Sequence, residues 1–234
     1  MKKVTIYILL FCCMLSFMPC HAEGPAESVE QAREQLQRLN IINEDSFSQE
    51  EIVYRCEAIV PIMKMIGLPE GYEDGNNFGT CLQPFSDVAK DRWNDENSPK
   101  NQYGIKVHYF GYLILAQNTW VAFGYKNNFS PYDAITAKET VAFMMRAIEE
   151  YVSTDLDEHY EHAKTCGLIQ PTDRFYEDGE VTITPNELCV LLNRMLYQPC
   201  NLYVNAPIFY WGRDSARTKR YIDIVNGDFP EDGD

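Results

Sequence analysis

The clearest hydrophobic pattern along the chain begins at Thr136, after which apolar residues recur every three to four positions, as on one face of a helix. Glu139 follows three positions later, so that each side chain can bond the other's backbone N–H in a capping box. The same spacing predicts helix starts at Thr184 with Glu187 and at Ser48 with Glu51. Apolar residues then occupy the fifth, eighth and twelfth positions after each cap: Val53, Cys56 and Val60; Val141, Met144 and Ile148; Cys189, Leu192 and Leu196.

A second apolar segment with helical character precedes each of these caps. The three segments begin near Val29, Tyr109 and Leu156. A single pair of helices cannot bury its own apolar face, whereas several similar pairs can build one shared core. The sequence therefore predicts an all-α fold of three helix–loop–helix repeats, followed by a short irregular or β-containing C-terminal extension.

The predicted boundaries follow from turn-rich and charged stretches between the periodic segments. We expect a signal peptide over 1–22, repeat 1 over 23–66, a turn-rich linker over 67–84, repeat 2 over 85–150, repeat 3 over 151–197, and an extension with an acidic tail over 198–234.

The N-terminus has the pattern of a secretory signal peptide. Lys2 and Lys3 precede an apolar run, and Cys20-His21-Ala22 offers small residues at the cleavage positions. We expect cleavage after Ala22, while an uncleaved membrane anchor and lipidation at Cys20 stay open as alternatives. Loss of the two lysines takes the formal net charge from −15 to −17. Such an acidic chain repels nucleic acid, which we exclude as a partner.

Five cysteines remain after the predicted cleavage, and none forms a C-x-x-C pair. Export permits disulfides, and the pairs Cys166–Cys189 and Cys81–Cys200 are both conceivable. We expect instead that Cys56 and Cys189 fill core positions as small hydrophobic residues. Without paired ligand spacing we predict no metal site and no cofactor.

Candidate catalytic chemistry is sparse. His159 and His162 share a helical face, which suits one metal ion, but the sequence lacks the third ligand of a metal-dependent hydrolase. We therefore read this segment as the solvated first helix of repeat 3. Serine-nucleophile and glycine-rich phosphate motifs are also absent, so we predict that the protein is not an enzyme. Trp120 immediately precedes Val121, and we expect its ring in the core.

One set of residues resembles a known family. Phe85-Ser86-Asp87-Val88, Trp93, Gly124-Tyr125, Phe129-Ser130-Pro131, Ile135-Thr136 and Arg146-Ala147-Ile148 together are similar to one S-layer homology repeat. The third unit keeps part of this pattern, and the first keeps less. The resemblance implies a pseudo-threefold domain with a central helix bundle, whose grooves hold cell-wall polysaccharide. Mapped onto this chain, it implies glycan-binding roles for four residues: Asp87, Trp93, Gly124 and Tyr125.

The chain departs from that family in its Thr-Arg-Ala-Glu motif. The arginine that pairs with an acidic sugar substituent is replaced by Gln49, Ala137 and Pro185 in the register set by the three caps. None of these side chains can bind a carboxylate bidentately as arginine does. We therefore expect a secreted, cell-wall-associated module for attachment to wall polysaccharide, or alternatively a degenerate fold of the same kind that binds an extracellular protein partner without glycan.

Overall fold

The computed structural model describes residues 24–43, 52–65, 85–88, 109–148 and 153–198, and only the backbone of 199–200, 202–205, 208–211 and 219–220. The predicted signal peptide, the 67–84 linker, Trp93, Ser48 and Glu51 lie outside these residues. The described part is helical, as predicted, with six helices: α2 (Val29–Arg38), α3 (Arg55–Met65), α4 (Phe110–Asn118), α5 (Ala137–Ile148), α6 (Leu156–Cys166) and α7 (Pro185–Leu196).

Four short strands follow α7 in the backbone trace. The strand β2 (Leu202–Asn205) pairs antiparallel with β3 (Ile208–Trp211), and β1 (Pro199–Cys200) pairs antiparallel with β4 (Lys219–Arg220). The β2–β3 pair coincides with the β-prone residues of the predicted extension. None of the described helices has the length and hydropathy needed to cross a membrane.

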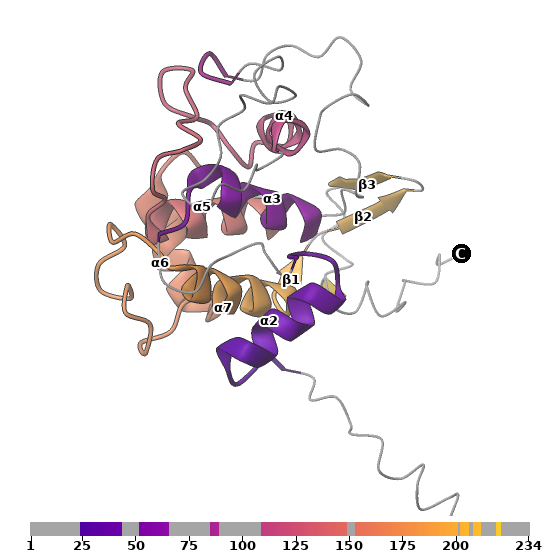
Figure 1. Ribbon diagram of the computed structural model, residues 1–234, viewed down its shortest axis with the longest axis vertical. Coiled ribbons are helices and arrows are strands. Elements are labelled where there is room, and N and C mark those ends of the chain that lie inside the picture. Colours follow the sequence, from indigo (N-terminus) through magenta and orange to yellow (C-terminus); the bar gives the residue numbers. More distant parts are fainter. Residues whose placement is uncertain are drawn as a thin grey trace, which may run out of the picture.

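The helices contact one another in a regular order. α2 packs on α7, α4 packs on α3, and α6 packs on α5. α3 also contacts both α5 and α7, and Figure 1 shows α3 lying between α4 and α7. The second helix of each consecutive pair, α3, α5 or α7, thus packs against the first helix of a different pair, α4, α6 or α2.

The residues just before α3, α5 and α7 meet in a closed ring of backbone hydrogen bonds. Val53 N–H donates to the Ile183 carbonyl at 3.2 Å, Ile135 N–H to the Val53 carbonyl at 2.9 Å, and Ile183 N–H to the Ile135 carbonyl at 3.2 Å. All three side chains are fully buried. The ring satisfies buried backbone groups that would otherwise be costly, so it fixes where the three helices start relative to one another.

Two of the expected capping boxes are present. Thr136 Oγ1 accepts from Glu139 N–H at 3.2 Å, and Thr136 N–H donates back to the Glu139 carboxylate at 3.2 Å. Thr184 and Glu187 exchange the same pair of bonds, at 3.3 and 2.8 Å. α5 and α7 accordingly begin one residue after these threonines.

The predicted start of the first of these helices at Ser48 is wrong, because α3 begins only at Arg55. Val53 occupies the ring position that Ile135 and Ile183 occupy, so Tyr54 is the counterpart of the capping threonines. Tyr54 has no oxygen placed for a cap, but its backbone N–H still donates to the Glu57 carboxylate at 2.9 Å. Long-range contacts, rather than a local hydroxyl cap, set this helix start.

The prediction that Trp120 lies in the core is also wrong, since 62% of the residue is exposed. Trp120 follows the end of α4 with a φ of +64°, which turns its side chain outward and leaves the core position to Val121. Cys56 and Cys189 are buried thiols, as expected, and Cys166 is exposed; none of the three is disulfide-bonded, so the conceived Cys166–Cys189 disulfide is not formed.

Candidate functional site

A cavity of about 600 Å³ opens where the start of α3 meets the 123–130 loop and α5. This volume falls within the range of small-molecule sites. Its lining includes Gly124 and Tyr125, two of the predicted glycan-binding residues, and also Arg55, which the sequence analysis did not select. We call this space the Arg55 groove.

Arg55 owes its place in the groove to backbone pairing. Its N–H donates to the Asp133 carbonyl at 3.1 Å, and the next N–H, from Cys56, donates to the Pro131 carbonyl at 3.0 Å. At the start of α5, Ala137 and Lys138 make the same two bonds, to Val181 and Gly179. Arg55 is therefore the positional counterpart of Ala137, so the assignment of this arginine position to Gln49 is wrong.

The Arg55 guanidinium is fixed in position, but not all of its hydrogen-bond donors are used. Its guanidinium forms an ion pair with Glu139 and donates from Nε to the Phe129 carbonyl at 2.8 Å. The group also lies over the Phe129 ring, 5.1 Å from its centroid. Among the described residues nothing accepts a hydrogen bond from Nη2, and the side chain is 13% exposed. A held guanidinium with unused donors is suited to an anionic ligand.

Arg146 supplies a second guanidinium to the lining. It is the counterpart of Arg194 in α7, since each lies ten residues after a capping threonine and donates from Nη1 to a turn carbonyl, Val121 or Leu168. Arg194 is neutralised by a two-bond pair with Asp173, at 2.6 and 3.0 Å. The corresponding turn, 122–128, contains no acidic residue, and the described residues provide no carboxylate for Arg146.

The charge state of Arg146 reflects this environment. The residue is only 5% exposed, and its guanidinium lies 4.8 Å from the centre of the Phe123 ring. Burial lowers the pKa of Arg146 to about 10, and the nearby positive charge of Arg55 adds to the lowering. Arg146 is still charged at neutral pH. The groove lining thus contains two guanidinium groups and two carboxylates, Glu139 and the exposed Asp133, and among the described residues only Glu139 pairs with one of the arginines.

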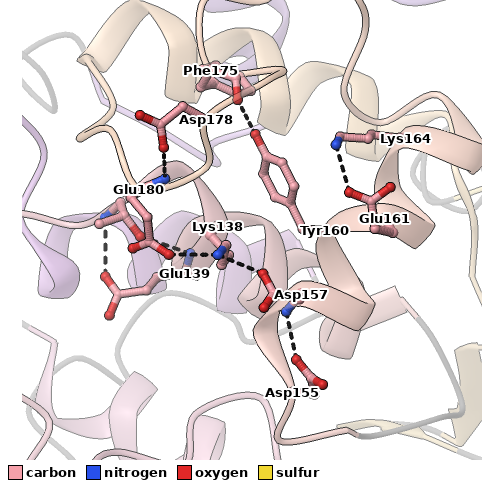
Figure 2. A network of polar contacts seen from close by, with 11 residues as sticks. Lys138, Glu139, Asp155, Asp157, Tyr160, Glu161, Lys164, Phe175, Asp178 and Glu180 are labelled. Carbon is pink, nitrogen blue, oxygen red and sulfur yellow. Dashed lines mark hydrogen bonds and ion pairs between the residues drawn. The ribbon is translucent and has the colours of Figure 1, made fainter.

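The matching junction between α5, α6 and the 178–182 loop is closed by ion pairs. Lys138 Nζ lies 2.7 Å from Asp157 and 2.6 Å from Glu180, and Figure 2 shows the ammonium group between these two carboxylates. Hydrogen bonds to both acids hold the pKa of Lys138 above its ordinary value. The cation at this junction is fully compensated by the protein, in contrast to the pair of arginines in the Arg55 groove.

Two predicted site residues shape the groove. Gly124 has a φ of +67°, and a Cβ there would lie 2.6 Å from both the Asn128 carbonyl oxygen and the Phe85 ring, so only glycine fits. Asp87 does not line the groove. Its two carboxylate oxygens accept from Phe129 N–H at 2.9 Å and Ser130 N–H at 2.6 Å, which fixes the loop that carries Tyr125.

The two histidines of α6 differ in their surroundings. His159 is 1% exposed, so the expectation that it lies on a solvated face of this helix is wrong, while His162, three residues further along α6, is exposed. The described residues contain no group of three potential metal ligands. The Ser153 carbonyl lies 3.0 Å from both His159 Nε2 and Arg146 Nε. Arg146 Nε also lies 3.3 Å from His159 Nε2, so the imidazole contacts both the Ser153 carbonyl and the Arg146 guanidinium.

His159 should make stability depend on pH. Burial lowers its pKa below the ordinary value, the bond to Ser153 opposes this, and Arg146 lowers the pKa further. The unfolded chain therefore binds more protons than the folded protein at mildly acidic pH, and stability present above about pH 6.5 is lost as the pH falls. We expect His159→Gln to flatten the fall in unfolding free energy between pH 7 and 5, measured with urea. Parallel wild-type and variant profiles would contradict this.

No protein-family model, curated protein or solved structure matches this chain at a significant level.

Proposed function

We propose that the chain is a secreted, non-enzymatic attachment module that binds acidic cell-wall polysaccharide in the Arg55 groove. In this proposal the six helices are three S-layer homology-like repeats around a pseudo-threefold axis. The ring of bonds among Val53, Ile135 and Ile183 supports the shared axis. The order in which α2, α4 and α6 pack on α7, α3 and α5 supports a cyclic arrangement of the repeats.

The observation that carries the proposal is the register of Arg55. The ring makes Tyr54-Arg55-Cys56-Glu57 the counterpart of Thr136-Ala137-Lys138-Glu139. The first of these sequences resembles the Thr-Arg-Ala-Glu motif of the S-layer homology family at its arginine and its glutamate. The proposed repeat 1 thus has an arginine at the motif position where the sequence analysis found none, and its side chain lines a groove with Gly124 and Tyr125.

The charges in the groove fit a ligand that carries its own acid. The whole chain has a formal net charge of −15, which repels anionic polymers at long range. Within the groove, Arg55 and Arg146 are matched in number by Glu139 and the exposed Asp133, but the described residues give Arg146 no carboxylate partner. A carboxylate placed between the two guanidinium groups would receive charge-assisted hydrogen bonds and would relieve the repulsion between them.

Retention on cell-wall sacculi tests the proposal. We expect the wild-type protein to sediment with sacculi that carry the wall polysaccharide, and not with sacculi from which it has been extracted. Arg55→Gln should weaken retention at least tenfold, because it removes charge-assisted bonds. Arg174→Gln is the matched control, since Arg174 also pairs with a capping glutamate, Glu187, but lies outside the groove with a side chain 53% exposed.

Two outcomes would contradict polysaccharide binding. One is equal sedimentation with both kinds of sacculi, and the other is wild-type retention by Arg55→Gln. The alternative, an extracellular protein-interaction module, is favoured by the ion pair that already occupies Arg55. Retention that persists without the polymer and disappears when the sacculi are treated with protease would support it. Thermal melting of each variant establishes that it is folded.

A further inference from the structure

Left-handed backbone conformations are concentrated beside the Arg55 groove. The described residues include seven with positive φ, and five of them fall between 120 and 130: Trp120, Gly124, Lys126, Asn127 and Ser130. Four of these five carry side chains, for which this conformation is unfavourable. Such conformations persist only where the surroundings enforce them, and they gather at ligand-binding sites.

Trp120 is the costliest of these residues. The turns that follow α2 and α6 also have one residue with positive φ, but there it is Asn40, at +56°, or Gly167, at +79°. Glycine and asparagine are the residues that adopt this conformation most readily, whereas a bulky aromatic residue is a genuine outlier. The fold of this turn therefore does not require tryptophan, since the two corresponding turns have residues that adopt a positive φ with less strain.

Burial of the indole in the core does not offset this backbone strain, because the residue is 62% exposed. It rests against Phe123, with ring centroids 5.7 Å apart. Phe123 in turn lines the groove beneath Arg146, and Tyr125, 73% exposed, lines the same groove. Trp120 thus presents an exposed aromatic ring that contacts the groove wall through Phe123.

We propose that Trp120 is a stacking platform for a sugar ring adjacent to the ring bound at Arg55. The proposal rests on the proposed function and adds a second, charge-independent subsite to it. One face of a pyranose presents C–H hydrogens, which are attracted to the electron-rich face of an aromatic ring. A protein partner would need a wider apolar patch, and the exposed large hydrophobic residues of the described part are only Ile52, Trp120 and Tyr125.

Trp120→Gly and Trp120→Asn test this without damaging the fold, since they install the residues found at the two equivalent turns. We expect both variants to keep the wild-type melting temperature or to exceed it, because the backbone strain is relieved. Their affinity for purified wall polysaccharide, measured by titration calorimetry, should be about tenfold weaker. Trp120→Phe keeps an aromatic face and should recover part of the affinity.

A carboxyl-reduced form of the same polysaccharide separates the two subsites. It retains the sugar rings but no acid, so its residual binding should fall in Trp120→Gly and should be unchanged in Arg55→Gln. The polymer should also shift the tryptophan emission of the wild-type protein and not that of Trp120→Gly. Wild-type affinity in Trp120→Gly, with weakened binding in Arg55→Gln, would overturn the stacking platform alone. Absence of polysaccharide binding by the wild-type protein would overturn the proposed function.

Discussion

Replacing Asp173 by asparagine should lower the free energy of unfolding by about 3 kcal/mol, because it leaves the Arg194 guanidinium without a counter-ion in a largely buried place. Both side chains are only 11% exposed, and the pair forms two hydrogen bonds. Asparagine keeps the oxygen that accepts from Gln170 N–H at 2.8 Å, so the change removes the charge and spares the turn. Urea unfolding at neutral pH measures the difference.

Asp178→Asn is the matched control for this prediction. Asp178 also accepts from a backbone N–H, that of Glu180 at 3.0 Å, but it is exposed and forms no ion pair among the described residues. We expect a change within about 0.5 kcal/mol. Adding Arg194→Met to Asp173→Asn should recover part of the lost stability, since no unpaired charge then stays buried. An Asp173→Asn protein as stable as the control would show that the pair contributes little.

The fold was predictable where helix starts carry a local signal. Thr136 and Thr184 each have the hydroxyl and the glutamate of a capping box, and α5 and α7 begin where these residues predict. For the helix start nearest the N-terminus, the same pattern selected Ser48, because Tyr54 offers no capping oxygen. The actual start of α3 depends on Val53 bonding Ile183 and on Arg55 bonding Asp133, residues more than 70 positions away. No local pattern can reveal such partners.

The candidate site was predicted in part: two of its lining residues were selected from the sequence, and Arg55 was missed. Gly124 and Tyr125 were selected because the residues around them carry the family resemblance, and both line the groove. Arg55 was missed because a six-residue error in register put Gln49 in its place. One signal in the sequence could have corrected this, since Arg55 is followed by Glu57 with the spacing of Thr-Arg-Ala-Glu. Trp120 was assigned to the core because it precedes Val121. The left-handed backbone at Trp120 instead directs its side chain to solvent, while the Val121 side chain is buried.

Arg146 illustrates a further limit of sequence reasoning. Its position after Thr136 marks it as the counterpart of Arg194, and sequence alone suggests the same structural role. Only the turn that follows the preceding helix distinguishes them, because Asp173 lies on one turn and the other has no acid. The loss of one carboxylate converts an internal ion pair into an uncompensated cation beside the groove. The proposed function relies on this lack of a carboxylate partner, which the position of Arg146 after Thr136 does not by itself reveal.

The second large effect is expected at the ring that joins the three helix starts. Ile135 is fully buried, and its backbone bonds both Val53 and Ile183. Ile135→Ala should therefore lower the free energy of unfolding by about 2–5 kcal/mol, since the rigid backbone ring prevents the surroundings from closing the cavity. Ile52→Ala is the control, because Ile52 is the neighbour of a ring residue but is 39% exposed, and a change within about 0.5 kcal/mol is expected.

A double-mutant cycle shows whether the ring acts as one unit. Ile183→Ala should cost as much as Ile135→Ala, for the same reason. If the two residues share a packed centre, the loss in the double variant should differ from the sum of the single losses by more than about 0.5 kcal/mol. Additive losses would mean that the two helix starts are stabilised independently. The proposed shared axis, and with it the proposal that the Arg55 groove lies between repeats, would then lose its physical basis.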